Sequence, residues 1–296
     1  MKMEVRDAGT KMNRLHSRVA DIISIVLGQR VNYMLRYYSN RHRFPNLRHP
    51  KDLSERILSS MLSKDFLKYA DYADKVKVRD YIKSKGLENI LLKQYGAWER
   101  AEDIPFDTLP EKFILKANNG SGGHVICTDK SKLNIPETIE KMNGTLKGAS
   151  HLRNTEPHYC AIKPMILCEE LLGDGVNLPI DYKFTCVQGK IADVFVVSER
   201  EEGAKYSTMD ADWKVLPYTK KEFMPVNIPP KPVHLKEMIE IAKTLSVDFE
   251  FVRVDLYDSK EGIYFSELTF SPWGGIMNSY TDEAIKIIGN MFADND

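Results

Sequence analysis

The chain has 296 residues, of which 43% are hydrophobic and 28% charged, and its 42 Lys and Arg residues balance its 42 Asp and Glu residues. This composition predicts a soluble globular protein with about two domains. The balance of charge excludes an overall field that would favour nucleic acid or a membrane surface as a partner.

The N-terminal region, residues 1–88, is predicted to be mainly helical. Apolar residues recur with helical spacing over residues 19–27, a stretch too short to span a bilayer. This favours a packing face over a helix that lies on a membrane surface. Residues 53–62 and 74–82 continue the helical pattern.

Residues 30–56 form a basic segment with seven basic residues and two acidic ones. Such a run is usually a solvated helix surface. The alternative is that the segment recognises an anionic substrate. In that case, replacing Arg41 and Arg43 would raise the KM for this substrate.

The pattern changes after residue 88 to short apolar runs bounded by turn residues. The predicted strands are residues 89–93, 112–116, 124–127, 162–168, 182–187, 190–197, 250–257 and 262–268. Tight turns predict hairpins at 187–190 and within 257–265, and helices are predicted at about 131–147 and 232–245. The expected architecture is therefore α+β, with hairpin-rich antiparallel or mixed sheets.

The four cysteines lie far apart, without the C-x-x-C spacing of a zinc site or a redox pair. Reduced thiols are typical of the cytoplasm. We therefore expect a cytoplasmic protein and leave open a peripheral contact with the inner membrane.

A glycine-rich loop follows the predicted strand that carries Lys116. Its glycines remove the Cβ atoms that would block a close approach of the backbone to an anion, and its N–H groups can converge on a phosphate. The residues expected to bind are Asn119, Gly120, Ser121, Gly122 and Gly123. The lysine precedes the glycines, which excludes a Walker motif. A surface hairpin without a ligand is the alternative interpretation.

Two carboxylates stand in the last two predicted strands. If these strands form a hairpin, Asp255 and Glu267 lie side by side, with Arg253 on the same face. Paired carboxylates repel unless a cation separates them, and oxygen ligands suit Mg²⁺. The alternative is an ion pair of Arg253 that only closes the sheet.

The order of these motifs resembles the ATP-grasp family, and their details resemble its TupA-like branch, which is linked to bacterial cell-surface polysaccharide synthesis. Six short motifs carry the resemblance, over roughly residues 45 to 280. They are "NLRHPKDLSERI" at 46–57, "ADKVKVRDYI" at 73–82, "LKANNGSGG" at 115–123, "EELL" at 169–172, "DYKF" at 181–184 and "ELTFSPWGG" at 267–275.

The resemblance implies the ATP-grasp fold, in which two subdomains clasp ATP. The expected division is a helical region up to residue 88, an N-terminal subdomain over 89–168 with the glycine-rich lid, and a C-terminal subdomain over 169–296 with the metal site.

The resemblance also implies where the nucleotide binds. Lys75 and Lys116 would contact the phosphates beneath the glycine lid, although Lys75 could instead be an exposed helix lysine. The hinge beside adenine and ribose would consist of Glu169, Glu170, Leu171 and Leu172.

The reacting groups implied by the family lie further along the chain. Asp181 and Lys183 point off one strand face, and Lys183 and Arg253 would act on the transferred phosphoryl group. Asp255 and Glu267 would hold Mg²⁺. Many ATP-grasp proteins carry Asn two residues after the metal Glu, whereas this chain has Thr269, so we expect one metal ion. Residues 271–275 would face the acceptor or form an ordinary turn around Trp273.

The implied function is an ATP-dependent carboxylate-amine ligase that works through an acyl phosphate. It would join an amino acid or another amine to a uronic acid or related component of a surface polysaccharide, such as a capsule or an O-antigen. Two alternatives remain: a kinase that phosphorylates a sugar hydroxyl, and a non-catalytic nucleotide-binding partner of a glycan assembly complex. The expected cofactors are ATP and Mg²⁺.

Overall fold

The computed structural model describes residues 26–120, 122–148, 155–173, 180–198 and 204–292. Most of the apolar stretch at 19–27 lies outside these residues. Within them, no helix is long and apolar enough to cross a bilayer.

Helices dominate the N-terminal region, as the sequence predicts. They are α2 (Gln29–Arg41), α3 (Leu53–Met61), η1 (Lys64–Tyr69), α4 (Ala70–Ala73) and α5 (Val78–Ser84). Helix α3 begins at Asp52, whose carboxylate accepts a hydrogen bond from the backbone N–H of Glu55 at 2.9 Å. Such an N-cap stabilises a helix by about 1 kcal/mol, which explains why α3 begins at that residue.

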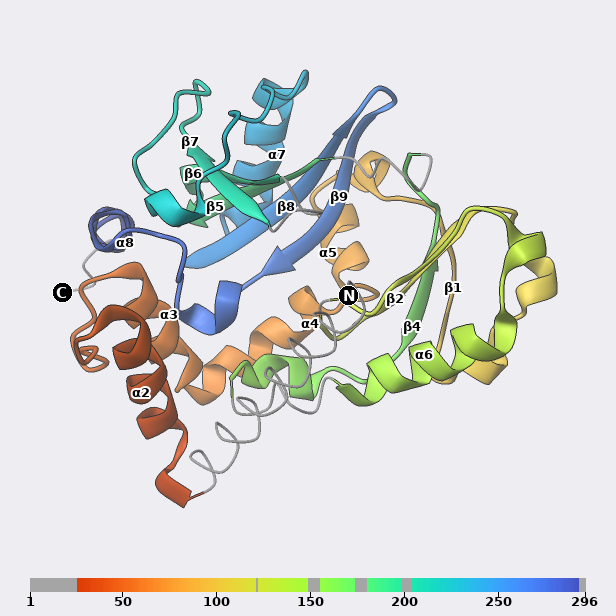
Figure 1. The fold of residues 1–296 in the computed structure, drawn as a ribbon, viewed down its shortest axis with the longest axis horizontal. Helices are drawn as coiled ribbons and strands as arrows, with labels where there is room; N and C mark the ends of the chain where they lie inside the picture. Colours follow the sequence, from red (N-terminus) through yellow and green to blue (C-terminus); the bar gives the residue numbers. More distant parts are fainter. Residues whose placement is uncertain (1–25, 121, 149–154, 174–179, 199–203, 293–296) are drawn as a thin grey trace.

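The smaller sheet has four antiparallel strands in the order β1-β4-β2-β3. The strands are β1 (Gln94–Trp98), β2 (Phe113–Ala117), β3 (Val125–Cys127) and β4 (Ile166–Glu169). Helix α6 (Ile135–Gly148) runs along this sheet (Figure 1). Phe113, Leu115 and Cys168 belong to a core that the sheet shares with α6.

The larger sheet has five antiparallel strands in the order β7-β6-β5-β8-β9. They are β5 (Asp181–Val187), β6 (Lys190–Ser198), β7 (Lys205–Met209), β8 (Phe251–Ser259) and β9 (Gly262–Thr269). Helices α7 (Leu235–Ser246) and α8 (Asp282–Gly289) pack beside it. The N-terminal helices contribute Tyr33, Leu53 and Leu58 to the same hydrophobic core, so they do not form a separate unit.

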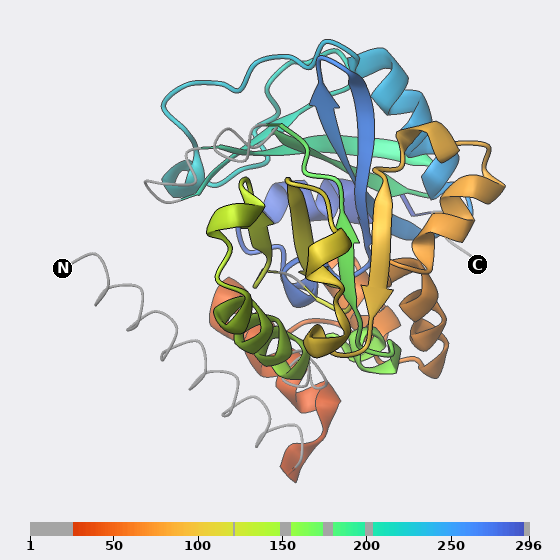
Figure 2. The ribbon, with the colours of Figure 1, turned by 90° about the vertical axis from the view of Figure 1, so that its right-hand side faces the viewer.

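The two sheets stand side by side, and Figure 2 shows the smaller one in front of the larger. Helix α3 lies next to α8 at the end of the larger sheet (Figure 1). Short 3₁₀ helices connect the elements: η2 (Glu88–Ile90), η3 (Ala101–Asp103), η4 (Phe106–Thr108), η5 (Lys130–Lys132), η7 (Pro157–Ala161), η8 (Lys221–Phe223) and η9 (Pro272–Gly275).

Both predicted hairpins are confirmed. The β5–β6 turn places Gln188 and Gly189 at φ values of 49° and 76°, as a two-residue hairpin turn requires. The first predicted strand, residues 89–93, is wrong because its apolar residues belong to η2 and the loop before β1. Strand β7 was not predicted, since its sequence KYSTM lacks an apolar run.

Candidate active site

One face of the larger sheet carries rows of polar side chains that run across neighbouring strands. Lys183 on β5 pairs with Asp255 on β8, which in turn pairs with Glu267 on β9. The adjacent row places Arg253 beside Thr269. Side chains two residues apart on a strand share a face, so the hairpin register brings these groups together as the sequence predicts.

These side chains form a continuous network of ion pairs. The Nε and Nη2 atoms of Arg253 each donate to one carboxylate oxygen of Asp255 at 2.7 Å. Lys183 donates to both Asp181 and Asp255. Asp255 is fully buried, so these cations supply the partners that a buried carboxylate requires.

Lys75 reaches this network from the turn between α4 and α5. Its Nζ atom lies 3.0 Å from Glu267 Oε2 and donates to the carbonyl oxygen of Gly120 in the glycine loop at 2.8 Å. The side chain is only 14% exposed, so Lys75 is not a solvated helix lysine. It connects the loop to the larger sheet.

The charges of the network set its protonation. Burial opposes ionisation of Glu267, but Lys75, Lys183 and Arg253 outweigh it and lower the pKa of this carboxyl to about 2. Burial alone would lower the pKa of Lys183, whereas Asp255 and Asp181 raise it. Both groups therefore carry their charges at neutral pH.

A second cluster lies at the end of β4. Glu169 accepts from Arg79 Nη1 through one oxygen and from Lys116 Nζ through the other, each at 3.1 Å. Arg79 also donates to the carbonyl oxygen of Leu92 at 2.7 Å. We did not predict Arg79 as a site residue, although it lies inside the motif at 73–82.

Asn118 joins the end of β2 to the helical region. Its Nδ2 atom donates to Asp74 at 2.9 Å, and its Oδ1 atom accepts from the backbone N–H of Met165 at 2.8 Å. Its carbonyl oxygen accepts from the backbone N–H of Lys75 at 3.3 Å. This residue was also missed, yet it fixes the position of Lys75 relative to the glycine loop.

The glycine loop combines an unusual backbone with an unpartnered acceptor. Gly122 and Gly123 have φ values of 77° and 68°, in the left-handed region that favours glycine. Asn119 is buried, and no described residue donates to its Oδ1 atom. Ser121 lies outside the described residues. These features suit a loop that closes around another molecule.

Residues 271–275 form a turn beside Arg253. Trp273, Gly274 and Gly275 all have left-handed φ values, of 50°, 59° and 82°. The Trp273 ring packs edge-on against Phe195 with 5.0 Å between centroids, and the Arg253 guanidinium lies 5.9 Å from the Trp273 ring. The turn therefore both packs against the core and borders the site.

Arg41 and Arg43, for which recognition of an anionic substrate is the alternative interpretation, both pair with acidic side chains of the chain itself. The Arg41 side chain is 1% exposed, pairs with Asp282 and donates to backbone carbonyl oxygens. Arg43 pairs with Asp52 and Glu55 at 2.6 and 3.1 Å. These ion pairs hold the C-terminal end of α2 and the residues after it against α3 and α8, and they neutralise the charges of both arginines.

The described residues contain no group of three or more His, Cys, Asp or Glu side chains that could hold a metal by itself. Asp255 and Glu267 nevertheless fit Mg²⁺, because they are cross-strand neighbours with oxygen donors and Glu267 is 22% exposed. Any such ion would need further oxygen ligands, as Mg²⁺ bound together with a nucleotide does.

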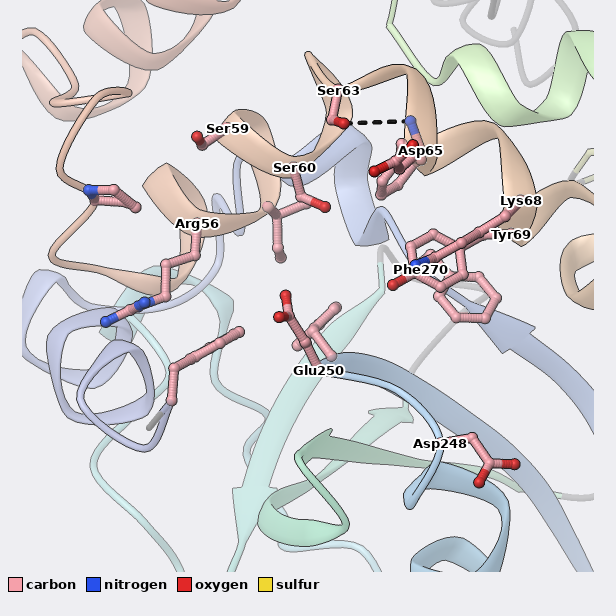
Figure 3. A pocket seen from close by; sticks show the side chains of 15 residues that line it. Arg56, Ser59, Ser60, Ser63, Asp65, Lys68, Tyr69, Asp248, Glu250 and Phe270 are labelled. Atoms are coloured by element: carbon pink, nitrogen blue, oxygen red, sulfur yellow. Dashed lines mark hydrogen bonds between the residues drawn. The ribbon is translucent and has the colours of Figure 1, made fainter. Parts of the chain in front are cut away.

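A separate pocket lies between α3, η1 and the start of β8 (Figure 3). It has a volume of about 510 Å³, and Glu250 points into its middle below Ser60. The Tyr69 and Phe270 rings stack at one side, with 4.4 Å between centroids. None of the predicted site residues lines it.

A family model described as TupA-like ATPgrasp matches residues 52–293. A search of curated proteins gives no match.

Three solved structures illustrate the likeness in fold. The D-alanine–D-alanine ligase from Bacillus anthracis is 14% identical at a TM-score of 0.43, over 80% of this chain and 64% of that one. The corresponding enzyme from Helicobacter pylori is 16% identical at a TM-score of 0.41, and the match covers 73% of this chain and 60% of that one. The L-amino acid ligase from Bacillus licheniformis is 11% identical at a TM-score of 0.41, and the match covers 89% of this chain and 56% of that one. The chain thus spans less than two thirds of the length of each.

Proposed function

The chain belongs to the TupA-like ATP-grasp family, and from this membership we propose that it is an ATP-dependent ligase that joins a carboxylate to an amine. The observation that carries the proposal is the row of Lys183, Asp255 and Glu267 beside Arg253. This row concentrates paired charges on one sheet face, next to a glycine loop that Lys75 contacts.

We propose that the nucleotide lies between the two sheets. Lys75 and Lys116 contact its phosphates, and the glycine loop, residues 118–123, closes over them as a lid. Glu169 already accepts from two cations, so the ribose hydroxyls fall to Glu170, which is exposed and follows it in the chain. Leu172 borders the adenine, and Asp181 orients Lys183.

Asp255 and Glu267 would hold Mg²⁺. The ion would supply positive charge against the phosphate oxygens during phosphoryl transfer. Thr269 offers only a hydroxyl, a weaker ligand than an amide oxygen, which favours a single ion. On this proposal Lys75 and Lys183 turn from the carboxylates toward the phosphates when nucleotide binds.

The chemistry proceeds in two displacements. A substrate carboxylate oxygen attacks the γ-phosphorus of ATP, the bond to the β-phosphate oxygen breaks, and ADP leaves. The amine nitrogen then attacks the acyl-phosphate carbonyl, the C–O bond to phosphate breaks, and an amide forms. Lys183 and Arg253 act as catalytic residues by stabilising the negative charge of the transferred phosphoryl group.

We further propose that the carboxylate belongs to a uronic acid or a related component of a bacterial surface polysaccharide, and that the amine is an amino acid or a similar small molecule. The link of the TupA-like branch to such polymers supports this assignment. The reaction would take place in the cytoplasm.

The test is ADP release by the full chain with Mg²⁺, ATP, a panel of uronic acids and sugar nucleotides, and a pool of amino acids. We expect turnover that requires both a carboxylate and an amine. Glu267→Gln should abolish it, whereas Glu250→Gln, which alters an exposed carboxylate in the separate pocket, should not. ADP release that needs only a hydroxyl compound would identify a kinase. No release with any mixture would contradict catalysis.

A further inference from the structure

Another carboxylate, that of Glu156, lies at the edge of the row of side chains that carries Arg253. It immediately precedes η7, and its Oε1 atom accepts from the Ser271 hydroxyl at 2.6 Å. Ser271 directly precedes η9, whose Trp273 ring lies 5.9 Å from the Arg253 guanidinium, so Glu156 lies near the reacting end of the site. Among the described residues, no group donates to its other oxygen.

Arg36 approaches the same place from helix α2, which lies outside the part of the chain that the family model matches. Its Nη1 atom donates to the carbonyl oxygen of Gly274 at 3.4 Å. A Cβ atom on Gly274 would lie 2.5 Å from Arg36 Nη2 and would displace the guanidinium, and the φ of 59° also favours glycine there. Arg41, five residues further along α2, donates to the carbonyl oxygens of Met277 and Tyr280 and so holds the helix in place.

The two side chains attract each other, yet among the described residues they do not form a direct ion pair. Burial raises the pKa of the Glu156 carboxyl, and Ser271, Arg36 and Arg253 oppose that rise. Burial lowers the pKa of Arg36, and Glu156 opposes this. Opposite charges that are half-buried and not paired with each other keep hydrogen-bonding capacity for a ligand.

We propose that Glu156 and Arg36 form the subsite for the amine substrate, and that this substrate is an α-amino acid. Its ammonium group contacts Glu156 and its carboxylate contacts Arg36, so each charge of the zwitterion meets its opposite. The inference rests on the proposed ligase function. It narrows the amine to an α-amino acid and assigns recognition of its carboxylate to a helix beyond the matched family region.

The proposed subsite also accounts for the two protons that the substrate ammonium group loses when the amide forms. An ammonium nitrogen has no lone pair, so it must lose one proton before it attacks the acyl-phosphate carbonyl. Glu156 accepts that proton. The second proton leaves the nitrogen as the C–N bond forms and the C–O bond breaks, and it departs with the released phosphate.

The first experiment measures binding by saturation-transfer NMR, with the full chain, Mg²⁺ and ADP. The probes are a pool of free α-amino acids of both hands and a matched pool of their α-amides, which lack the carboxylate. We expect transfer to amino acids and much less to amides. Arg36→Gln should weaken amino-acid binding by about tenfold to a hundredfold. Arg30→Gln, an exposed arginine on the same helix, should leave it unchanged.

Equal transfer to both pools, no transfer to amino acids, or equal effects of Arg36→Gln and Arg30→Gln would overturn the inference.

A second measurement separates this inference from the ligase proposal. Hydroxylamine traps an acyl phosphate as a hydroxamate without using an amino-acid subsite. Arg36→Gln and Glu156→Gln should therefore keep hydroxamate formation from the active carboxylate while losing amide formation, which also shows that the variants fold. Absence of hydroxamate with the unaltered chain would count against the ligase proposal. Full amide formation by both variants would count against the subsite.

Discussion

Asp193→Asn tests a buried carboxyl group that lacks an ion-pair partner among the described residues. Asp193 lies on β6, is fully buried, and accepts from the Tyr280 hydroxyl at 3.0 and 3.1 Å and from the Thr185 hydroxyl at 3.0 Å. Burial raises the pKa of this carboxyl to about 7, against those hydrogen bonds and the distant charge of Arg253.

The size of the expected pH effect follows from the pKa of the Asp193 carboxyl in the unfolded and in the folded chain. Its ordinary pKa is 3.8, so the unfolded chain releases the proton near that pH, whereas the folded protein keeps it up to about pH 7. The folded state therefore binds more protons in this window, and the free energy of unfolding falls as pH rises through it. The gap corresponds to about 4 kcal/mol, of which roughly 2–3 kcal/mol is lost between about pH 5 and pH 8.

The assay is urea unfolding at both pH values. Asn keeps an acceptor for the two hydroxyls but does not titrate, so the variant should lose roughly 2–3 kcal/mol less than the unaltered protein between about pH 5 and pH 8. Asp212→Asn, in an exposed turn, is the matched control and should keep the original dependence. An unchanged dependence in Asp193→Asn would show that this carboxyl is ionised in the folded protein and refute the reasoning.

Two further predictions concern the thiols and the lid. A thiol reagent should modify Cys160 first in the native protein, because Cys160 is exposed while the other three cysteines are buried. Burial also raises the pKa of each of those three thiols. Equal rates of modification for all four cysteines would contradict this prediction. In urea unfolding, Gly123→Ala should cost about 1–3 kcal/mol more than Gly122→Ala. Both have left-handed φ, but a Cβ on Gly123 would lie 2.5 Å from Thr145 Oγ1, whereas Gly122 faces open space. Equal losses would assign the whole cost to backbone conformation.

The sequence predicts those parts of the fold whose signals are local. Strands β5, β6, β8 and β9 show apolar runs joined by tight turns, so both their existence and their pairing follow. Strand β7 lies in the larger sheet with a mostly polar sequence, which a pattern of buried residues does not reveal. Conversely, Ile90 and Leu92 are buried without belonging to a strand, because a loop and a 3₁₀ helix also contribute to the core.

In the candidate site, too, contacts within a hairpin can be predicted from the sequence and contacts between distant segments cannot. Asp255 and Glu267 could be paired from sequence, since a short hairpin fixes which residues face each other. The contacts of Glu169 with Arg79, and of Arg36 with Gly274, join segments 90 and 238 residues apart. No spacing rule predicts such pairs, because they depend on how the helices pack against the two sheets.

Among the described residues, the network on the larger sheet carries equal numbers of positive and negative side chains. Its three cations, from Lys75, Lys183 and Arg253, meet the three anions of Asp181, Asp255 and Glu267. A buried charge is costly when it is left alone, so each group must gain a new partner before it can leave its present one. A nucleotide that arrives with its metal ion meets this requirement, since its phosphates can receive the lysines while the ion receives the carboxylates. On the proposed function, a nucleotide without the ion would draw away the cations and leave buried carboxylates unpaired, so we predict that metal and nucleotide bind this site together.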